Sequence, residues 1–245
     1  MKVIAFSNQK GGVGKTTSAV SVGAALARQG KRVILIDLDS QGNMTQGLGV
    51  ENPDFTINGL LFHEQPIHAY PVTKNLVLVA GDGSLSNFDK NAQDKIQREF
   101  ILKKALESLK LKSDYIILDC PPMLGLVTIN AFTFADDIYI PVEAQKYSIE
   151  GLAKVFEMVE AVNEINPVLK VKGIFFTRHN HHKILNRDVE EYIRKTYGDT
   201  VLKTYIRENV ALRESPHANE DIFRYAPDSN GAEDYLNLTQ EILTK

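Results

Sequence analysis

The sequence has few of the features that mark secreted, membrane-spanning or strongly basic proteins. Cys120 is its only cysteine, so one chain can form neither an internal disulfide nor a sulfur-only metal site. No apolar run approaches the roughly 18 residues of a membrane-spanning helix. The 28 Lys and Arg residues nearly balance 31 Asp and Glu residues, so overall charge does not predict binding to nucleic acid or anionic lipid. The N-terminus lacks an export-type leader, and we expect a cytoplasmic protein.

The hydrophobic pattern alternates between short apolar runs and longer amphipathic stretches. The runs are nearly continuous, as expected for parallel strands covered on both faces; they span Lys2–Ser7, Arg32–Asp37, Leu76–Val79, Tyr115–Asp119, Asp137–Pro141 and Val171–Thr177. The intervening stretches predict helices, and a last helix follows them; their ranges are Thr16–Gln29, Gln97–Leu109, Ile149–Ile165, Leu185–Tyr197 and Ala232–Leu243. This alternation predicts an α/β fold, a doubly wound and mostly parallel sheet with helices on both faces, in a single domain over residues 1–245.

A glycine-rich segment, S-N-Q-K-G-G-V-G-K-T-T, joins the first predicted strand to the first predicted helix. Its glycines let the backbone wrap around an anion, and the helix that follows directs its positive end to the same place. A lysine can then reach β- and γ-phosphates, and a threonine hydroxyl can ligate Mg²⁺. The segment predicts a phosphate-binding loop made of Lys10, Gly11, Gly12, Val13, Gly14, Lys15, Thr16 and Thr17.

The loop departs from the ordinary pattern because Gln9 stands at the position of its first glycine and Lys10 follows. The run K-G-G-V-G-K-T resembles the deviant Walker A family of P-loop ATPases, which includes ParA partition proteins, MinD and the nitrogenase iron protein. The resemblance implies ATP or ADP as ligand and a nucleotide-sandwich homodimer, in which Lys10 reaches phosphates held by the other subunit. The alternative is that Lys10 only steadies its own loop.

Three aspartates follow predicted strands and bear on magnesium and water. Asp37 and Asp39 lie in D-L-D-S-Q-G-N, which resembles the second signature of the ParA group. The resemblance implies that Asp39 orients the attacking water and that Asp37 supports the water shell of Mg²⁺; the alternative is that both cap a loop. Asp119 ends the strand I-I-L-D before C-P-P, as in a Walker B motif, and is predicted to lie near Mg²⁺ with Thr16. By the same resemblance, Gly125 is expected in the loop that senses the γ-phosphate.

Further matches extend the resemblance over nearly the whole chain. The segments P-V-E-A-Q, E-G-L and V-L-K-T-Y-I-R-E-N-V-A-L-R-E-S-P are similar to chromosomal Soj and small plasmid ParA proteins. Such proteins lack an N-terminal DNA-reading domain, and none is expected here. Arg207 replaces a family proline that lines the adenine pocket, and its guanidinium plane can also stack on a base. Thr177, Ile206 and Arg207 are the candidates for adenine contacts.

The resemblance also implies nonspecific DNA binding by the ATP-bound dimer. Two family arginines are lost at Glu208 and Ala211, but residues 170–213 carry ten Lys and Arg against five acidic residues. This excess predicts a DNA-facing patch, with a merely solvated face as the alternative. The candidate contacts are Arg178, Lys183, Lys203 and Arg213. A nearby cluster, His179, His181 and His182, is interpreted as a polar surface loop rather than a metal site.

Rival functions on this fold differ in their grafted sites. Membrane positioning of the MinD kind needs a basic amphipathic C-terminal helix, whereas this C-terminal stretch has three acidic residues and only Lys245 as a base. A reductase like the nitrogenase iron protein needs two cysteines per subunit. With these rivals set aside, the resemblance to ParA implies a DNA partition ATPase that a ParB-like partner switches off by stimulating hydrolysis. The alternative is a related ATPase that positions a non-DNA cargo, and a biosynthetic ligase remains a further option.

Overall fold

The computed structural model describes residues 1–108, 112–145, 148–179 and 184–245. These residues form one seven-stranded sheet in the order β3-β4-β2-β5-β1-β6-β7. The strands are β1 (Lys2–Phe6), β2 (Val33–Asp37), β3 (Tyr70–Thr73), β4 (Leu76–Val79), β5 (Tyr115–Asp119), β6 (Asp137–Val142) and β7 (Lys170–Phe176). Neighbouring strands are parallel except for the β3–β4 pair at one edge. The predicted fold class is confirmed.

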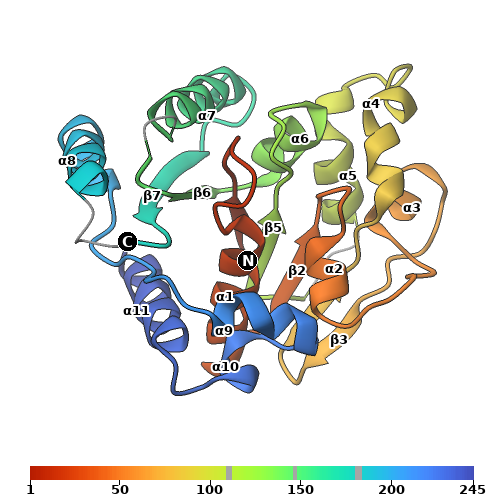
Figure 1. Cartoon of the computed structure of the whole chain (residues 1–245). Helices are drawn as coiled ribbons and strands as arrows, with labels where there is room; N and C mark the ends of the chain where they lie inside the picture. Colours follow the sequence, from red (N-terminus) through yellow and green to blue (C-terminus); the bar gives the residue numbers. More distant parts are fainter. Residues whose placement is uncertain (109–111, 146–147, 180–183) are drawn as a thin grey trace.

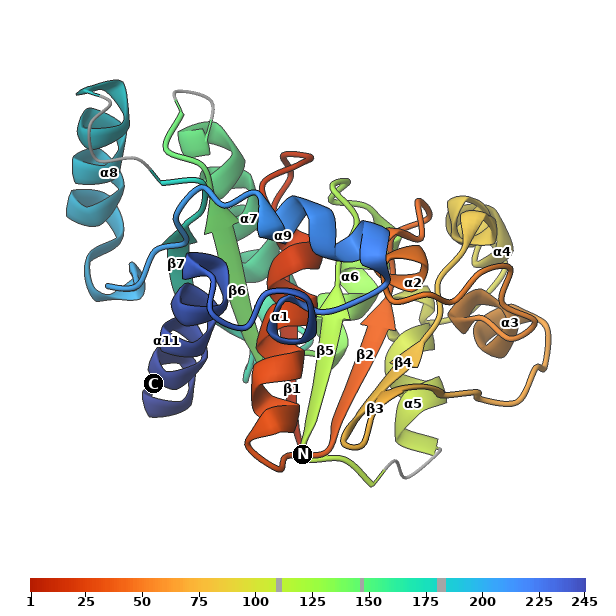
Figure 2. The ribbon, with the colours of Figure 1, turned by 60° about the horizontal axis from the view of Figure 1, so that its bottom comes forward.

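Helices cover both faces of this sheet. The longer ones are α1 (Lys15–Arg28), α5 (Ile101–Ser108), α6 (Leu126–Phe134), α7 (Ser148–Asn163), α8 (Ile184–Tyr197) and α11 (Asn230–Thr244). The short ones are α2 (Asn43–Gly47), α3 (Ile57–Phe62), α4 (Phe88–Asn91), α9 (Ala211–Glu214) and α10 (Ile222–Tyr225). Single 3-10 turns occupy Gly83–Asn87, Arg98–Phe100, Gly198–Thr200 and Ser215–Ala218. Figures 1 and 2 show α1 and α11 on one face and α5, α6 and α7 on the other.

The core divides into two apolar layers because successive side chains of a strand point to opposite faces. In β1, Val3 and Ala5 pack with α5, α6 and α7, whereas Ile4 and Phe6 pack with α1 and α11. All four are nearly inaccessible to solvent. No helix in the described part of the chain combines the length and apolar character needed to span a bilayer.

The register of the central strands brings their carboxyl ends to one edge. Phe6 pairs with Asp119 across β1 and β5, and Asp37 pairs with Asp119 across β2 and β5. Ligands of open α/β sheets bind outside this edge. The loops after β1, β2, β5, β6 and β7 therefore meet where the sequence places its polar motifs.

Several elements differ from the sequence prediction. The predicted helix Gln97–Leu109 is a 3-10 turn followed by α5, because Gln97 has a left-handed backbone with φ of 56°. The antiparallel strand β3 and the helix α6 were not predicted, and neither were the short helices. The other predicted helices and strands are present, with ends shifted by at most two residues.

Candidate functional site

The phosphate loop lies between β1 and α1 and is open on one side. Gly12 and Gly14 have φ of 75° and 92°, values that side chains other than glycine rarely adopt. A Cβ added to Gly11 or Gly12 would meet no atom within 4 Å. The first turn of α1 has no side-chain cap and no acidic residue. The loop therefore presents an uncapped helix N-terminus suited to an anion.

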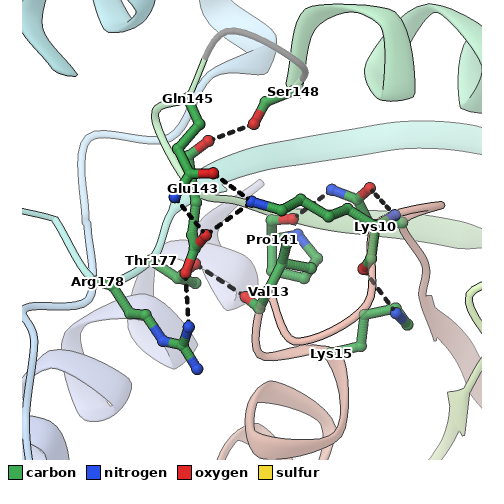
Figure 3. Close-up of polar contacts among 10 residues, drawn as sticks. Lys10, Val13, Lys15, Pro141, Glu143, Gln145, Ser148, Thr177 and Arg178 are labelled. Atoms are coloured by element: carbon green, nitrogen blue, oxygen red, sulfur yellow. Dashed lines mark hydrogen bonds and ion pairs between the residues drawn. The ribbon is translucent and has the colours of Figure 1, made fainter. Parts of the chain in front are cut away.

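Neighbouring strands fix both ends of this loop. The Asn8 side chain donates to the Pro141 carbonyl at 2.7 Å and accepts from the Lys10 backbone N–H at 3.0 Å. The Thr177 hydroxyl donates to the Val13 carbonyl at 2.9 Å (Figure 3). These bonds tie the loop to the ends of β6 and β7.

Lys15 is buried beneath the loop. Its Nζ donates to the Lys10 carbonyl at 3.1 Å, and the residue is 6% exposed. Burial lowers the pKa of Lys15, and the negative charges of Asp119 and Asp39 partly oppose that shift. The ammonium group thus sits among carboxylates at the predicted phosphate position.

Only one of the two Asp119 carboxylate oxygens has a hydrogen-bond partner among the described residues. Its Oδ2 accepts from the Thr16 hydroxyl at 2.6 Å, whereas its buried Oδ1 has no hydrogen-bond partner among the described residues. Complete burial raises the pKa of Asp119, and the neighbouring Asp37 charge raises it further. An orphaned buried oxygen beside a threonine hydroxyl fits a magnesium ion and its water shell.

Both carboxylate oxygens of Asp37 accept hydrogen bonds from within the chain. One of its oxygens accepts from the Thr45 backbone N–H at 2.9 Å and from the Thr45 hydroxyl at 2.7 Å. The other accepts from the Asp39 N–H at 3.2 Å. Burial raises the pKa of Asp37 to about 6, against the lowering effect of these bonds. Asp39 is 7% exposed and its Oδ1 accepts from the Gln41 N–H at 3.0 Å.

Lys10 extends from the loop toward the end of β6. Its Nζ lies 2.9 Å from Glu143 Oε2 and 2.6 Å from Gln145 Oε1. Figure 3 shows this side chain pointing away from that of Lys15. Sequence reasoning matched the segment P-V-E-A-Q but gave Glu143 no role, because nothing in the sequence pairs it with the loop.

The three residues predicted to contact adenine line one pocket beside the phosphate loop. Thr177, Ile206 and Arg207 lie around it; its remaining lining is Val13, Gly14, Thr17, Arg178, Glu208, Asn209, Leu212, Arg213 and Tyr235. The Arg207 guanidinium is held by Asp234 and Glu233, each at 2.6 Å from Nη2. These carboxylates raise the pKa of Arg207, which stays charged. Sequence reasoning missed both acidic partners.

Gly125 lies in a different place from the adenine candidates. It precedes α6 as its N-cap residue and lines a second pocket with Pro121, Met123 and Phe88. The Met123 side chain is 73% exposed. The loop after β5 therefore faces solvent in the chain as it stands.

The predicted DNA contacts have unequal surroundings. Arg178 forms an ion pair with Glu143 at 2.8 Å, while Lys203 and Arg213 are exposed. Lys183 lies outside the described residues, as do His181 and His182. The interpretation of His179 as part of a surface loop is wrong, because this histidine is buried and its Nε2 lies 3.1 Å from Glu190.

Comparison with known proteins adds to this geometry. Residues 1–171 match the model of a family described as an AAA domain. The chain is 42% identical to the sporulation initiation inhibitor protein Soj of Bacillus subtilis, over 98% of both chains. It is 37% identical to the chromosome-partitioning ATPase Soj of Treponema pallidum, over 100% of this chain and 98% of that protein.

Two solved structures have the same fold over almost the whole chain. A Borrelia burgdorferi protein solved as a plasmid partition protein with AMPPNP has a TM-score of 0.83 at 28% identity, covering 99% of this chain and 98% of that one. The cobyrinic acid a,c-diamide synthase of Mycobacterium smegmatis, with ADP and magnesium, has a TM-score of 0.86 at 30% identity, covering 99% and 94%. On these matches, the chain belongs to the Soj and ParA family of partitioning ATPases.

Proposed function

We propose that this protein is an ATP-switched DNA partition ATPase. It binds ATP with Mg²⁺, closes as a nucleotide-sandwich homodimer, and then binds DNA without sequence preference. A ParB-like partner returns it to the free state by stimulating hydrolysis. The observation that carries the proposal is the contact between Thr16 and Asp119 beneath an uncapped loop, with Asp119 Oδ1 left without a partner among the described residues.

The nucleotide would lie along the loop with its base in the adjoining pocket. The backbone N–H groups of Gly11–Lys15 and the start of α1 would bind the phosphates. The base would lie among Thr177, Ile206 and Arg207. Because Asp234 and Glu233 hold the Arg207 guanidinium, its plane is oriented before a base arrives, and less side-chain freedom is lost on binding.

Thr16 and Asp119 would hold Mg²⁺, and Asp37, whose oxygens accept from Thr45 and Asp39, would support its water shell from behind them. When bound, this ion would neutralise charge on the phosphate oxygens. Lys15 would bind the β- and γ-phosphates. Asp39 would orient the attacking water, since it follows the same strand end and its N–H is fixed by Asp37. Gly125 would let the loop after β5 approach the γ-phosphate.

Lys10 would supply the second positive charge, to the nucleotide held by the other subunit. DNA binding would follow from Arg178, Lys183, Lys203 and Arg213 when two copies present them together. The name of the Treponema pallidum relative, a chromosome-partitioning ATPase, supports a function in DNA partition.

The test is DNA binding by the purified protein at low salt, without nucleotide, with ADP and with ATP and Mg²⁺. We expect binding only with ATP, and a steep loss of affinity as salt rises. Lys15→Ala should abolish nucleotide binding and with it DNA binding. Asp39→Ala should trap an ATP-loaded dimer that still binds DNA but turns over at least about tenfold more slowly, since water positioning is lost.

Two results would contradict parts of this proposal. Unchanged turnover in Asp39→Ala would refute the water-positioning role. An ATP-loaded wild-type dimer that ignores DNA at low salt would favour the alternative, an ATPase that positions a non-DNA cargo.

A further inference from the structure

We propose that Glu143 is a positioning residue that holds Lys10 in a resting position and thereby opposes dimer closure. The inference rests on the proposed nucleotide-sandwich dimer, in which Lys10 must leave its own subunit's surface. In the structure Lys10 is instead bound in cis. We call the four side chains involved, Lys10, Glu143, Gln145 and Arg178, the Glu143 clasp.

The clasp gives Lys10 two acceptors. Its Nζ lies 2.9 Å from Glu143 Oε2 and 2.6 Å from Gln145 Oε1. Gln145 also donates from Nε2 to Glu143 Oε2 at 3.0 Å, so the two acceptors hold each other in place. Figure 3 shows the three side chains converging at the end of β6.

Glu143 is shared between two cations. Its Oε1 lies 2.8 Å from Arg178 Nη1, on the side opposite Lys10. The Glu143 side chain is 10% exposed, whereas those of Lys10 and Arg178 are 35% and 52% exposed. A carboxylate this buried is costly without a cation, while either cation can return to water.

Backbone contacts fix the clasp from two strands. The Ser148 hydroxyl and the Gln145 N–H both donate to the Glu143 carbonyl, which shapes the turn after β6. Arg178 follows β7 with φ of 48°, a left-handed conformation that is uncommon for arginine. The carboxylate is thus held at a set position by the backbone at the ends of both strands.

This arrangement allows an exchange of partners. When Lys10 leaves for a second copy's phosphates, Glu143 keeps Arg178, so the buried carboxylate is never unpaired. Arg178 therefore weakens the hold of Glu143 on Lys10 by competing for the same charge. Two variants should then act in opposite directions: Glu143→Gln should free Lys10, and Arg178→Ala should hold it more tightly.

The first test needs no nucleotide. The rate at which an amine-acylating reagent modifies Lys10 is measured by peptide mass spectrometry in the full chain. We expect about two- to fivefold faster labelling in Glu143→Gln, the range that a half-exposed ion pair supports, and slower labelling in Arg178→Ala. Lys31, exposed between α1 and β2, is the internal reference, and its labelling rate should not change. Equal Lys10 rates in all three proteins would overturn the proposal.

The second test measures dimerisation with AMPPNP and Mg²⁺ by sedimentation, together with a thermal melt of each variant. Because closure opens one clasp in each subunit, the two effects multiply. We expect Glu143→Gln to lower the dimer dissociation constant by about four- to 25-fold and Arg178→Ala to raise it. Faster labelling of Lys10 in Glu143→Gln without tighter dimerisation would show that the clasp does not oppose closure. Weaker dimerisation of this variant, with an unchanged melt, would place Glu143 in the interface instead and would also overturn the proposal.

The two experiments distinguish failure of the proposed function from failure of the Glu143 clasp. A wild-type chain that stays monomeric with AMPPNP contradicts the proposed function and the opposition to closure. The labelling rates then decide alone whether Glu143 holds Lys10.

Discussion

At the scale of single residues, the two aspartates that pair across β2 and β5 set the electrostatics of the site. Asp37 and Asp119 are both fully buried and adjacent in register. Burial raises the pKa of Asp37 to about 6, while in an unfolded chain an aspartate titrates near 4. The folded chain therefore binds more protons than the unfolded chain between about pH 4 and pH 6. Asp37 thus contributes stability that is present below pH 4 and lost as pH rises through 6.

This gives a pH prediction for the variant Asp37→Asn. The free energy of unfolding of the nucleotide-free protein should fall by about 2 kcal/mol more in wild type than in the variant between pH 4.5 and pH 7. Urea unfolding of both proteins across this range measures the difference.

Asp114→Asn is the control for this pH series. The hydrogen bonds and charge of Arg32 lower the pKa of Asp114 to about 2. The stability that Asp114 contributes is therefore lost only as pH falls from about 4 toward 2. The stability difference between Asp114→Asn and wild type should therefore stay constant between pH 4.5 and pH 7. A constant difference for Asp37→Asn over the same range would contradict the raised pKa.

At this scale, the sequence predicts a site residue where the local backbone conformation or a neighbouring loop requires that residue type. Gly12 and Gly14 sit where φ is positive, and Thr16 and Asp119 meet because a loop and a strand end are adjacent in any such fold. The sequence does not predict the contact between Glu143 and Lys10, because the two residues are 133 positions apart in the chain. For the same reason the acidic partners of Arg207 could not be predicted.

At the scale of elements, the loop after β4 approaches the end of β2 very closely. A Cβ at Gly81 would lie 2.4 Å from the Asp37 carbonyl oxygen and 3.1 Å from the Asp37 Cβ. The Gly81 N–H also donates to the Thr45 hydroxyl at 2.9 Å, the group that donates to Asp37. A side chain at Gly81 would have to separate these two segments.

We therefore predict that Gly81→Ala destabilises the protein by about 1–3 kcal/mol and lowers ATP turnover by displacing Asp37. Gly83→Ala is the matched control, because a Cβ there would meet nothing within 4 Å; it should change stability by less than about 1 kcal/mol. Urea unfolding and phosphate release measure the two effects. Equal stabilities of the two variants would refute the close-approach argument.

The elements that sequence reasoning missed lack the pattern it relies on. The helix α6 is buried along most of its length, so its apolar residues show no helical period. The strand β3 contains Pro71 and is only half-buried, as an edge strand can be. The 3-10 turn before α5 depends on the left-handed backbone of Gln97, which no residue type at that position signals.

At the scale of the whole molecule, the pocket forms because a late segment returns to the sheet. Val201 bridges to Ile174 and Arg207 bridges to His179, so this stretch runs parallel to β7. It brings Ile206 and Arg207 beside the phosphate loop. The pattern of strands and helices predicts the doubly wound class, but it does not give the strand order or this return. The single-domain organisation stays a prediction.

The distribution of exposed basic residues gives the last prediction. Lys203 and Arg213 are exposed, and Arg213 lies at the rim of the predicted base pocket. Arg178 has its ion pair with Glu143, so a DNA phosphate would have to compete for it. If Lys203 and Arg213 each bind one phosphate per subunit, Lys203→Ala and Arg213→Ala should each weaken binding of the ATP-loaded dimer to every sequence alike. The logarithm of affinity falls linearly with the logarithm of salt concentration, and each phosphate contact adds about 1 to the steepness of that line. Each variant should therefore give a shallower line, by about 1 for every DNA phosphate contact it loses.

Lys31→Ala is the control for this charge argument, because Lys31 is also exposed but precedes β2, at the sheet edge opposite the phosphate loop. Fluorescence anisotropy with a random-sequence duplex at several salt concentrations measures the three slopes. The chain carries a net charge of −3, so its global field repels DNA, and only a local patch can give attraction. If Lys31→Ala lowers DNA affinity as much as the other two variants do, then binding does not depend on this patch.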